Sequence, residues 1–321
     1  MSTTAMQSHP LVSILVPAKD EAENLPEFMR QAAAVFAAEP GKYEVIVIDD
    51  GSTDATPRVL AQLEREYPFL QSARHMKRRG IADALRTGYL RSRGEVLVFY
   101  PADLQFKPED IPKLVDPILA GDFDMMTGRK EGEYDKAFVS GIYNGLSRKL
   151  FDVPVRDLNS VKAYRREVMA SLPMRPDWHR YMIVVAAHNG YTVGETPIPL
   201  YPRVAGKSKF GIGRIPVGVI DMLAVWFELR FARKPLLFFG MLGAFLFLIG
   251  VLTGIAAVLY RIIAGVGFRP LLTLIEVCLI LGSVFFATGL LAELMAAQRA
   301  EIAELRRRIE EVVVRETESQ R

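Results

Sequence analysis

Acidic side chains follow three short apolar segments in the first third of the chain. The segments and their acids are 12–16 with Glu21, 44–48 with Asp49 and Asp50, and 96–100 with Asp103. Branched apolar runs of this length are typical of buried strands, so each acid is expected where a strand meets a loop. Three such loops at the ends of successive strands predict one polar crevice at the rim of a parallel sheet. An α/β protein binds a nucleotide and its metal at such a rim.

The second loop reads Asp49-Asp50-Gly51-Ser52-Thr53-Asp54. Gly51 permits a sharp turn, and Asp54 is placed to cap the next helix. A carboxylate at a strand end can accept hydrogen bonds from a nucleobase imide or from ribose hydroxyls. The alternative is turn and cap chemistry alone, which we favour for Ser52 and Asp54. For Asp50 we favour recognition of the base.

The third loop carries Asp103 and Gln105 behind the apolar segment 96–100. Oxygen ligands at a strand end suit Mg²⁺ or Mn²⁺, which would bridge the two phosphates of a nucleotide diphosphate. An isolated Asp-x-Gln pair is unspecific, but its register with the two earlier loops strengthens the prediction. The four histidines have no metal-ligand spacing.

The elements that would hold these loops alternate along the chain up to about residue 210. We expect strands at 12–16, 44–48 and 95–100 and helices at 23–38, 55–67 and 81–92. Strands that alternate with helices predict an α/β fold with a mostly parallel, doubly wound sheet. Right-handed crossovers would then bring the loops after the strands to one edge of that sheet.

Two long apolar runs follow in the last third. Residues 235–260 hold no charge, and 271–292 are interrupted only by Glu276. Each run reaches the roughly 20 residues that cross a bilayer, so we predict two transmembrane helices. Arginines and lysines cluster before the first run and after the second, which places both ends in the cytoplasm. Glu276 would then lie near the outer interface, across the membrane from the crevice.

Helical patterns flank these runs on both sides. Residues 215–233 combine an aromatic, apolar face with basic flanks, which favours a helix on the membrane surface over an ordinary core helix. Beyond 292, apolar residues recur every three or four positions, as in a short coiled coil or a helix that leaves the membrane. The pattern leaves homo-oligomerisation open.

Composition excludes several classes of protein. The net charge of +3 does not indicate a nucleic-acid binder. Cys278 is the single cysteine, which excludes a disulfide framework and a thiolate metal cluster. Residues 1–10 are polar without the apolar core of a signal peptide, so we expect the large N-terminal part to stay in the cytoplasm.

Several motifs together resemble family 2 GT-A glycosyltransferases, and more narrowly the dolichyl-phosphate mannose synthase-like polyprenyl-phosphate sugar transferases. They are Pro17…Glu21, Asp49-Asp50-Gly51-Ser52, Gly80-x-x-x-Ala84-Leu85-x-x-Gly88, Ala102-Asp103-Leu104-Gln105, Glu195-x-Pro197-Ile198 and Arg203-x-x-Gly206-x-Ser208-Lys209. The resemblance covers about residues 11–210, and the two apolar runs match the bacterial membrane-anchored branch.

The resemblance implies roles for individual residues. The nucleoside would be held by Pro17, Ala18, Glu21, Asp49 and Asp50, and the metal, Mg²⁺ or Mn²⁺, by Asp103 and Gln105. Arg203 and Lys209 would contact phosphates of the donor or of the lipid acceptor. Asp157 aligns with a family aspartate near the acceptor and the metal. On the acceptor side would lie Arg129, Ser208 and Lys136. Together with Arg148 and Lys149, Lys136 could form a basic mouth facing anionic lipid, although each of these three could equally be solvated surface.

Three departures from the family pattern stand out. Pro101 replaces the first carboxylate of the usual Asp-x-Asp, which leaves the metal site to Asp103 and Gln105. Lys77-Arg78-Arg79 stands where the family often has Asn-x-Gly, and this adds positive charge near the donor. Val161-Lys162-Ala163-Tyr164 replaces the usual Gly-Phe-Arg element behind the acceptor-side aspartate.

The expected protein is an inverting glycosyltransferase that moves a sugar from a UDP- or GDP-sugar to polyprenyl phosphate at the cytoplasmic face of the inner membrane. The alternatives are transfer to another lipid or glycan acceptor, and a nucleotide-sugar-binding membrane protein with impaired catalysis. The expected parts are a tail at 1–10, a GT-A domain at 11–212, a juxtamembrane helix at 213–234, membrane spans at 235–260 and 271–292, and a cytoplasmic helix at 293–321.

Overall fold

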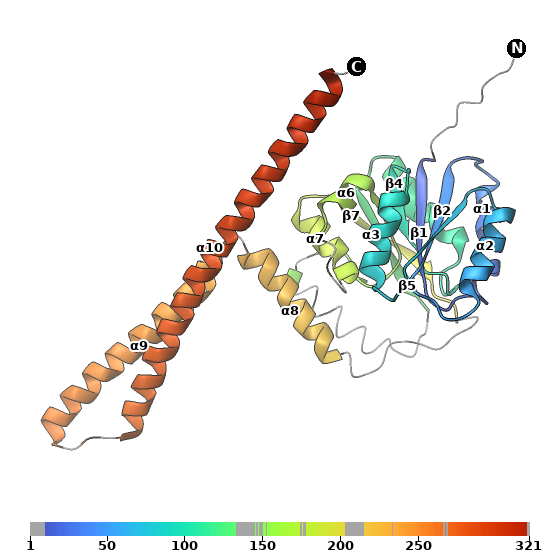
Figure 1. Ribbon diagram of the computed structural model, residues 1–321. Helices are drawn as coiled ribbons and strands as arrows, with labels where there is room; N and C mark the ends of the chain where they lie inside the picture. The colour runs from blue at the N-terminus through green and yellow to red at the C-terminus, as the bar shows by residue number, and fades with distance from the viewer. Residues whose placement is uncertain are drawn as a thin grey trace, which may run out of the picture. The chain divides into compact units, whose positions relative to one another are not determined.

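The computed structural model describes residues 10–132, 145, 147, 150–151, 153–173, 175, 178–202, 215–232, 234–265, 267 and 269–319. The chain divides into two compact units, Met1–Met222 and Leu223–Arg321. The first is built around a β-sheet and the second consists of helices (Figure 1). The finer sequence-derived boundaries inside and between these units stay predictions.

Seven strands form the sheet of the first unit. They are β1 Val12–Ala18, β2 Tyr43–Asp49, β3 Leu70–Arg74, β4 Val96–Phe99, β5 Met125–Glu131, β6 Lys162–Arg165 and β7 Val193–Pro199. Their order across the sheet is β3-β2-β1-β4-β6-β5-β7. Strands β3, β2, β1 and β4 run parallel to one another, whereas β6 is antiparallel to both of its neighbours. The prediction of a mostly parallel α/β sheet is confirmed.

The central strands are buried on both faces because helices flank the sheet (Figure 1). The helices are α1 Leu25–Phe36, α2 Thr56–Glu66, α3 Ile81–Arg91, η1 Pro108–Asp110, α4 Ile111–Leu119, α6 Arg166–Ser171, η2 Trp178–Arg180 and α7 Met182–His188. Helix α1 turns Leu25, Phe28 and Met29 into the core. The three helices and three strands expected in the first hundred residues are all present, and their ends differ from the expected ones by only a few residues.

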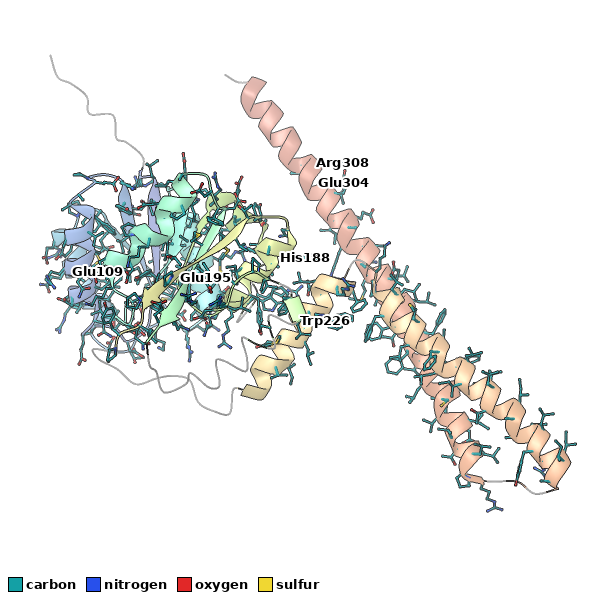
Figure 2. The ribbon with its side chains drawn as sticks, turned by 180° about the vertical axis from the view of Figure 1, so that it is seen from behind. Glu109, His188, Glu195, Trp226, Glu304 and Arg308 are labelled. Carbon is teal, nitrogen blue, oxygen red and sulfur yellow. The ribbon has the colours of Figure 1, made fainter. Side chains whose placement is uncertain are left out.

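The second unit begins within helix α8, Ile215–Phe231, and continues with α9, Pro235–Ala264, and α10, Arg269–Ser319. Helix α9 and the first part of α10 are long and apolar enough to cross a membrane. Helix α10 runs without a break through both the second apolar run and the charged segment behind it. On that charged segment Glu304 and Arg308 lie one turn apart and form an ion pair of 3.1 Å (Figure 2).

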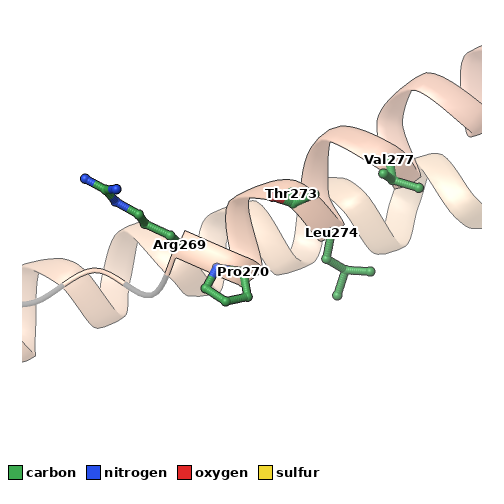
Figure 3. Close-up of a pocket in the computed structure, with 5 residues that line it drawn as sticks. All are labelled: Arg269, Pro270, Thr273, Leu274 and Val277. Atoms are coloured by element: carbon green, nitrogen blue, oxygen red, sulfur yellow. The ribbon is translucent and has the colours of Figure 1, made fainter.

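The two apolar helices pack against each other along most of α9. At the start of α9 the backbone N–H of Leu236 donates to the carboxylate of Glu293 on α10, over 3.1 Å. This bond satisfies one of the N–H groups that a helix N-terminus leaves without an intrahelical partner. At the other end of the pair, a shallow apolar pocket of about 600 Å³ lies over the first turns of α10 (Figure 3). It is lined by Arg269, Pro270, Thr273, Leu274 and Val277.

Candidate functional site

The three acidic loops emerge at one edge of the sheet. Strand β1 lies between β2 and β4, and all three run in the same direction. In the register of β1 and β2, Ala18 pairs with Asp49, so the first and second loops begin side by side. The carboxyl ends of parallel strands at such an edge form the crevice where α/β proteins bind ligands.

Hydrogen bonds join the first and second loops. The backbone N–H of Asp20 donates to Oγ of Ser52 over 2.8 Å, and the N–H of Thr53 donates to Oδ1 of Asp20 over 2.8 Å. The N–H of Glu21 donates to Oγ1 of Thr56 over 2.9 Å. Asp20 has a positive φ of 54°, a conformation that costs a non-glycine residue energy. These hydrogen bonds hold the first loop, which contains Glu21, in this conformation.

Asp49 is buried and its carboxylate is engaged inside the protein. Oδ1 accepts the backbone N–H of Ser52 over 2.8 Å, and Oδ2 lies 3.2 Å from Nε of Arg74. These contacts shape the turn after β2. A direct contact of Asp49 with a nucleotide stays a prediction, as do the nucleoside contacts of Pro17, Ala18 and Glu21.

Asp50 connects the second loop to the turn that precedes α3. Its Oδ1 accepts the backbone N–H of Arg79 over 2.7 Å and lies 2.8 Å from Nδ1 of His75, and its Oδ2 accepts the N–H of Gly80 over 2.8 Å. Burial opposes ionisation, but the bonds from His75, Arg79 and Gly80 outweigh it and hold the pKa of Asp50 below its usual value. The carboxylate is therefore ionised at neutral pH.

The third loop turns sharply between its two expected metal ligands. Leu104 has a positive φ of 55°, although its side chain is buried in the core. Oδ1 of Asp103 accepts the backbone N–H of Gln105 over 3.3 Å. Side-chain oxygens from two residues of one tight turn are suitable ligands for a hard divalent cation. The described residues contain no group of three or more His, Cys, Asp or Glu side chains that could hold a metal. A cation here would therefore need further oxygens from a diphosphate and water.

Asp157 lies in the loop before β6, the strand between β4 and β5 in the sheet. Its Oδ2 is 3.4 Å from Nζ of Lys130 on β5, and its Oδ1 accepts the backbone N–H of Asn159 over 3.0 Å. Glu195 on β7 accepts the backbone N–H groups of Arg156 and Asp157 through its Oε1, over 2.8 and 2.9 Å. A carboxylate and a cation from neighbouring strands thus fix this loop.

Sequence reasoning did not assign a role to Lys162 on β6, which is completely buried. Its Nζ donates to the backbone carbonyl of Ser160 over 2.7 Å. Burial lowers its pKa to about 7; the charge of Asp157 raises it and that of Lys130 lowers it further. The sequence signal that could have indicated a buried lysine is the position of Lys162 inside the otherwise apolar segment 161–164. The ring of His179 meets Phe99, the residue opposite Lys162, edge-on, and burial lowers the pKa of His179 to about 3.

The other residues predicted for the acceptor side stay predictions. Arg129 lies on β5, where its guanidinium forms an ion pair of 2.8 Å with Glu131. Its contact with an acceptor phosphate stays a prediction. The remaining basic and hydroxyl candidates lie outside the described residues, and they are Lys136, Arg148, Lys149, Arg203, Ser208 and Lys209.

Comparison with known proteins decides the family. The sequence pattern of Glycosyl transferase family 2 matches residues 13–153. Dodecaprenyl-phosphate galacturonate synthase of Rhizobium johnstonii is 30% identical over 296 residues, which cover 89% of this chain and 87% of the relative. The chain belongs to glycosyl transferase family 2.

A second relative of the glycosyltransferase agrees with this assignment, and a solved structure shows the fold. The undecaprenyl-phosphate 4-deoxy-4-formamido-L-arabinose transferase of Pseudomonas fluorescens is 27% identical, with 92% of this chain and 88% of the relative covered. Glucosyl-3-phosphoglycerate synthase from Mycobacterium tuberculosis, crystallised with Mn²⁺, UDP and phosphoglyceric acid, superposes with a TM-score of 0.56 at 19% identity. The superposition covers 68% of this chain and 78% of that one, and it shows that the fold is GT-A.

Proposed function

We propose that this glycosyltransferase moves a sugar from a nucleotide-sugar donor to polyprenyl phosphate, with inversion at C1. The observation that carries the proposal is the edge of the sheet where the loops after β1, β2 and β4 meet, in a chain that also has two helices apolar enough to cross a membrane. The names of the two relatives, a dodecaprenyl-phosphate and an undecaprenyl-phosphate enzyme, support a lipid phosphate as acceptor.

In the proposed donor site, the loops after β1 and β2 hold the nucleoside. Pro17 and Ala18 are the last two residues of β1, Glu21 lies in the loop behind them, and Asp50 directly follows β2. The ionised carboxylate of Asp50 can accept a hydrogen bond from the base. UDP- and GDP-sugars both present such donors, so either nucleotide is compatible with this contact.

Asp103 and Gln105 would hold Mg²⁺ or Mn²⁺ together with the diphosphate of the donor. The crystal structures of the neighbouring fold with Mn²⁺ or Mg²⁺ and UDP support a divalent ion in such a site. The bound ion would neutralise negative charge on the nucleoside diphosphate as it leaves. Arg203 and Lys209 are proposed to add positive charge to the same phosphates.

The acceptor needs no strong general base, because a phosphate monoester is already ionised at neutral pH. One of its oxygens attacks C1 of the sugar, the new C1–O bond forms opposite the old one, and the nucleoside diphosphate departs with the electrons of the broken bond. The enzyme's contribution is orientation and charge stabilisation. Asp157 is proposed to line the acceptor side, where Lys130 and Glu195 fix its loop.

We further propose that the enzyme resides in the inner membrane with its GT-A domain and both termini in the cytoplasm. The clusters of basic residues before α9 and after the apolar part of α10 support this orientation. The catalytic crevice would then act on lipid phosphate at the cytoplasmic face.

The test is formation of a sugar lipid by membranes that contain the enzyme. Membranes are incubated with labelled UDP- and GDP-sugars, Mg²⁺ or Mn²⁺, and undecaprenyl phosphate, and label is measured in the chloroform phase. We expect one donor to give labelled lipid, and expect Asp103→Ala to abolish it while Asp122→Ala, at an exposed position of the same domain, leaves it unchanged. Label that appears only with a diacylglycerol or glycan acceptor would refute the proposed acceptor.

A further inference from the structure

His75 lies buried between the second loop and helix α3. Its Nδ1 is 2.8 Å from Oδ1 of Asp50, and its Nε2 is 2.9 Å from Oγ1 of Thr87. A carboxylate can only accept hydrogen bonds, so in the neutral ring Nδ1 carries the proton and Nε2 accepts from the threonine hydroxyl. A side chain without an assigned role thus connects Asp50 to a regular helix.

This contact limits what the carboxylate of Asp50 can still bind. An ionised carboxylate has about four acceptor positions, two on each oxygen. Within the described part of the chain, Oδ1 receives N–H groups from His75 and Arg79, and Oδ2 receives the N–H of Gly80. One acceptor position on Oδ2 is left, and it matches a single N–H or O–H donor of a nucleoside.

The turn that supplies these N–H groups is packed tightly against the end of β2. Gly51 has a φ of +70°, and a Cβ on it would lie 2.8 Å from the backbone N of Arg78 and from the carbonyl carbon of Lys77. Glycine therefore allows the turn to approach. Hydrogen bonds to Asp50 and the close contact with Gly51 hold the turn in place. The side chains of Lys77, Arg78 and Arg79 are exposed.

We propose that His75 is a positioning residue for nucleotide binding, which, held by Thr87, fixes the Asp50 carboxylate and leaves its one remaining acceptor position to the nucleoside. The inference rests on the proposed function, since it takes Asp50 to be a nucleoside contact. His75 itself contacts neither the sugar nor the diphosphate in this arrangement. Its loss should therefore weaken donor binding and leave the chemical step intact.

The test compares His75→Leu, His75→Asn and Thr87→Val in the full-length enzyme in detergent. Affinity for UDP and GDP with Mn²⁺ is measured by calorimetry, donor KM and kcat by sugar-lipid formation, and folding by thermal unfolding. His188→Leu, at an exposed histidine of α7, is the matched control. Asparagine keeps an N–H donor near the place of Nδ1, whereas leucine removes it.

We expect His75→Leu to weaken nucleotide binding and raise donor KM by about tenfold or more, the cost of a lost hydrogen bond to a charged group. Thr87→Val should give a smaller change in the same direction. His75→Asn should recover most of the affinity, and kcat at saturating donor should stay near that of the wild type. If His75→Leu does not fold, Thr87→Val is compared with His75→Asn. The first variant removes the hydroxyl that supports His75, and the second keeps an N–H donor for Asp50.

Two failures are distinguishable. If the wild-type enzyme binds neither these nucleotides nor other nucleoside diphosphates, the proposed function fails. If the wild-type enzyme binds a nucleotide and the folded variants bind it equally well, or lose only kcat, then His75 has a purely structural role and the present inference is overturned.

Discussion

Gly243 of α9 and Gly282 of α10 lie so close together that neither position has room for a side chain. A Cβ on Gly243 would lie 2.7 Å from the carbonyl oxygen of Gly282, and a Cβ on Gly282 would lie 2.8 Å from the carbonyl oxygen of Gly243. In a bilayer, apolar helices associate by close packing rather than by leaving water, so small residues bring backbones together. The contact is reciprocal and is formed by backbone atoms that cannot move aside.

Gly282→Val is therefore expected to separate the two helices. Overpacking of a tight contact costs about 1–3 kcal/mol, and here backbone rather than a side chain meets the added atoms. We expect a lower thermal unfolding temperature of the full-length enzyme in detergent. Gly254→Val is the matched control, because the nearest atom to a Cβ there is 3.8 Å away, on Ile275. Equal stability of the two variants would contradict this packing.

Leu104 is expected to support the proposed metal site through its backbone. The buried side chain holds a residue with φ of 55° between Asp103 and Gln105. Leu104→Ala should lower stability by about 2–4 kcal/mol, as for other large-to-small changes in a core. It should also weaken Mn²⁺-dependent nucleotide binding, because the turn loses the buried side chain that fixes its conformation.

Leu114→Ala, at a core position on α4, is the control for loss of a buried leucine. It should cost comparable stability and leave Mn²⁺-dependent binding unchanged. Calorimetric titration of both variants at a temperature where each is folded makes the comparison. If the two variants bind nucleotide and Mn²⁺ equally well, Leu104 contributes only packing.

Replacement of Lys162 by methionine is expected to stabilise the protein. Burial disfavours the charged amine and lowers its pKa to about 7 from 10.5, so the unfolded chain holds the proton more tightly than the folded one. The cost of burying the charge is complete below pH 7 and declines as pH rises toward 10.5. Lys162→Met should therefore gain on the order of 1–3 kcal/mol near pH 6 and less at pH 9.

Urea unfolding of the wild type and of Lys162→Met at these two pH values measures the difference. Lys162→Arg provides the comparison, since it retains a charge that does not titrate in this range. A stability difference that does not change between pH 6 and pH 9 would show that the amine is charged throughout, contrary to the lowered pKa.

The positions of the acidic loops could be predicted from sequence because apolar runs of strand length end directly before them. The contacts that hold each acid in place could not be predicted from sequence. Asp50 is fixed by His75 and by the N–H groups of Arg79 and Gly80, which come from a turn about 25 to 30 residues further along the chain. No periodicity connects such partners; they meet because β2 and β3 are neighbours.

The part of the sheet around β6 shows the same limit more strongly. Strand β6 lies between β4 and β5 and runs antiparallel to both, an order that short apolar segments do not specify. Lys162 was noticed only as a departure from the family pattern. Its burial depends on that strand order, which places it opposite Phe99. Local spacing therefore predicted the edge formed by β2, β1 and β4 better than the surroundings of β6.

Glu195 is expected to control the proposed acceptor side through the backbone of the Asp157 loop. One carboxylate oxygen, Oε1, accepts the N–H groups of both Arg156 and Asp157, and Figure 2 shows Glu195 in the sheet unit. Glu195→Ala removes this acceptor and leaves two N–H groups without it, at a cost of about 1–3 kcal/mol. The loop and the Asp157 carboxylate should then lose their fixed position.

Glu195→Gln is the conservative variant, because its amide oxygen can still accept both N–H groups. In sugar-lipid assays with varied undecaprenyl phosphate, we expect Glu195→Ala to raise the acceptor KM several-fold and Glu195→Gln to stay closer to the wild type. Donor KM should change little in either variant, since the loops proposed to hold the nucleoside follow β1 and β2. A rise in donor KM with an unchanged acceptor KM would place Asp157 on the donor side instead.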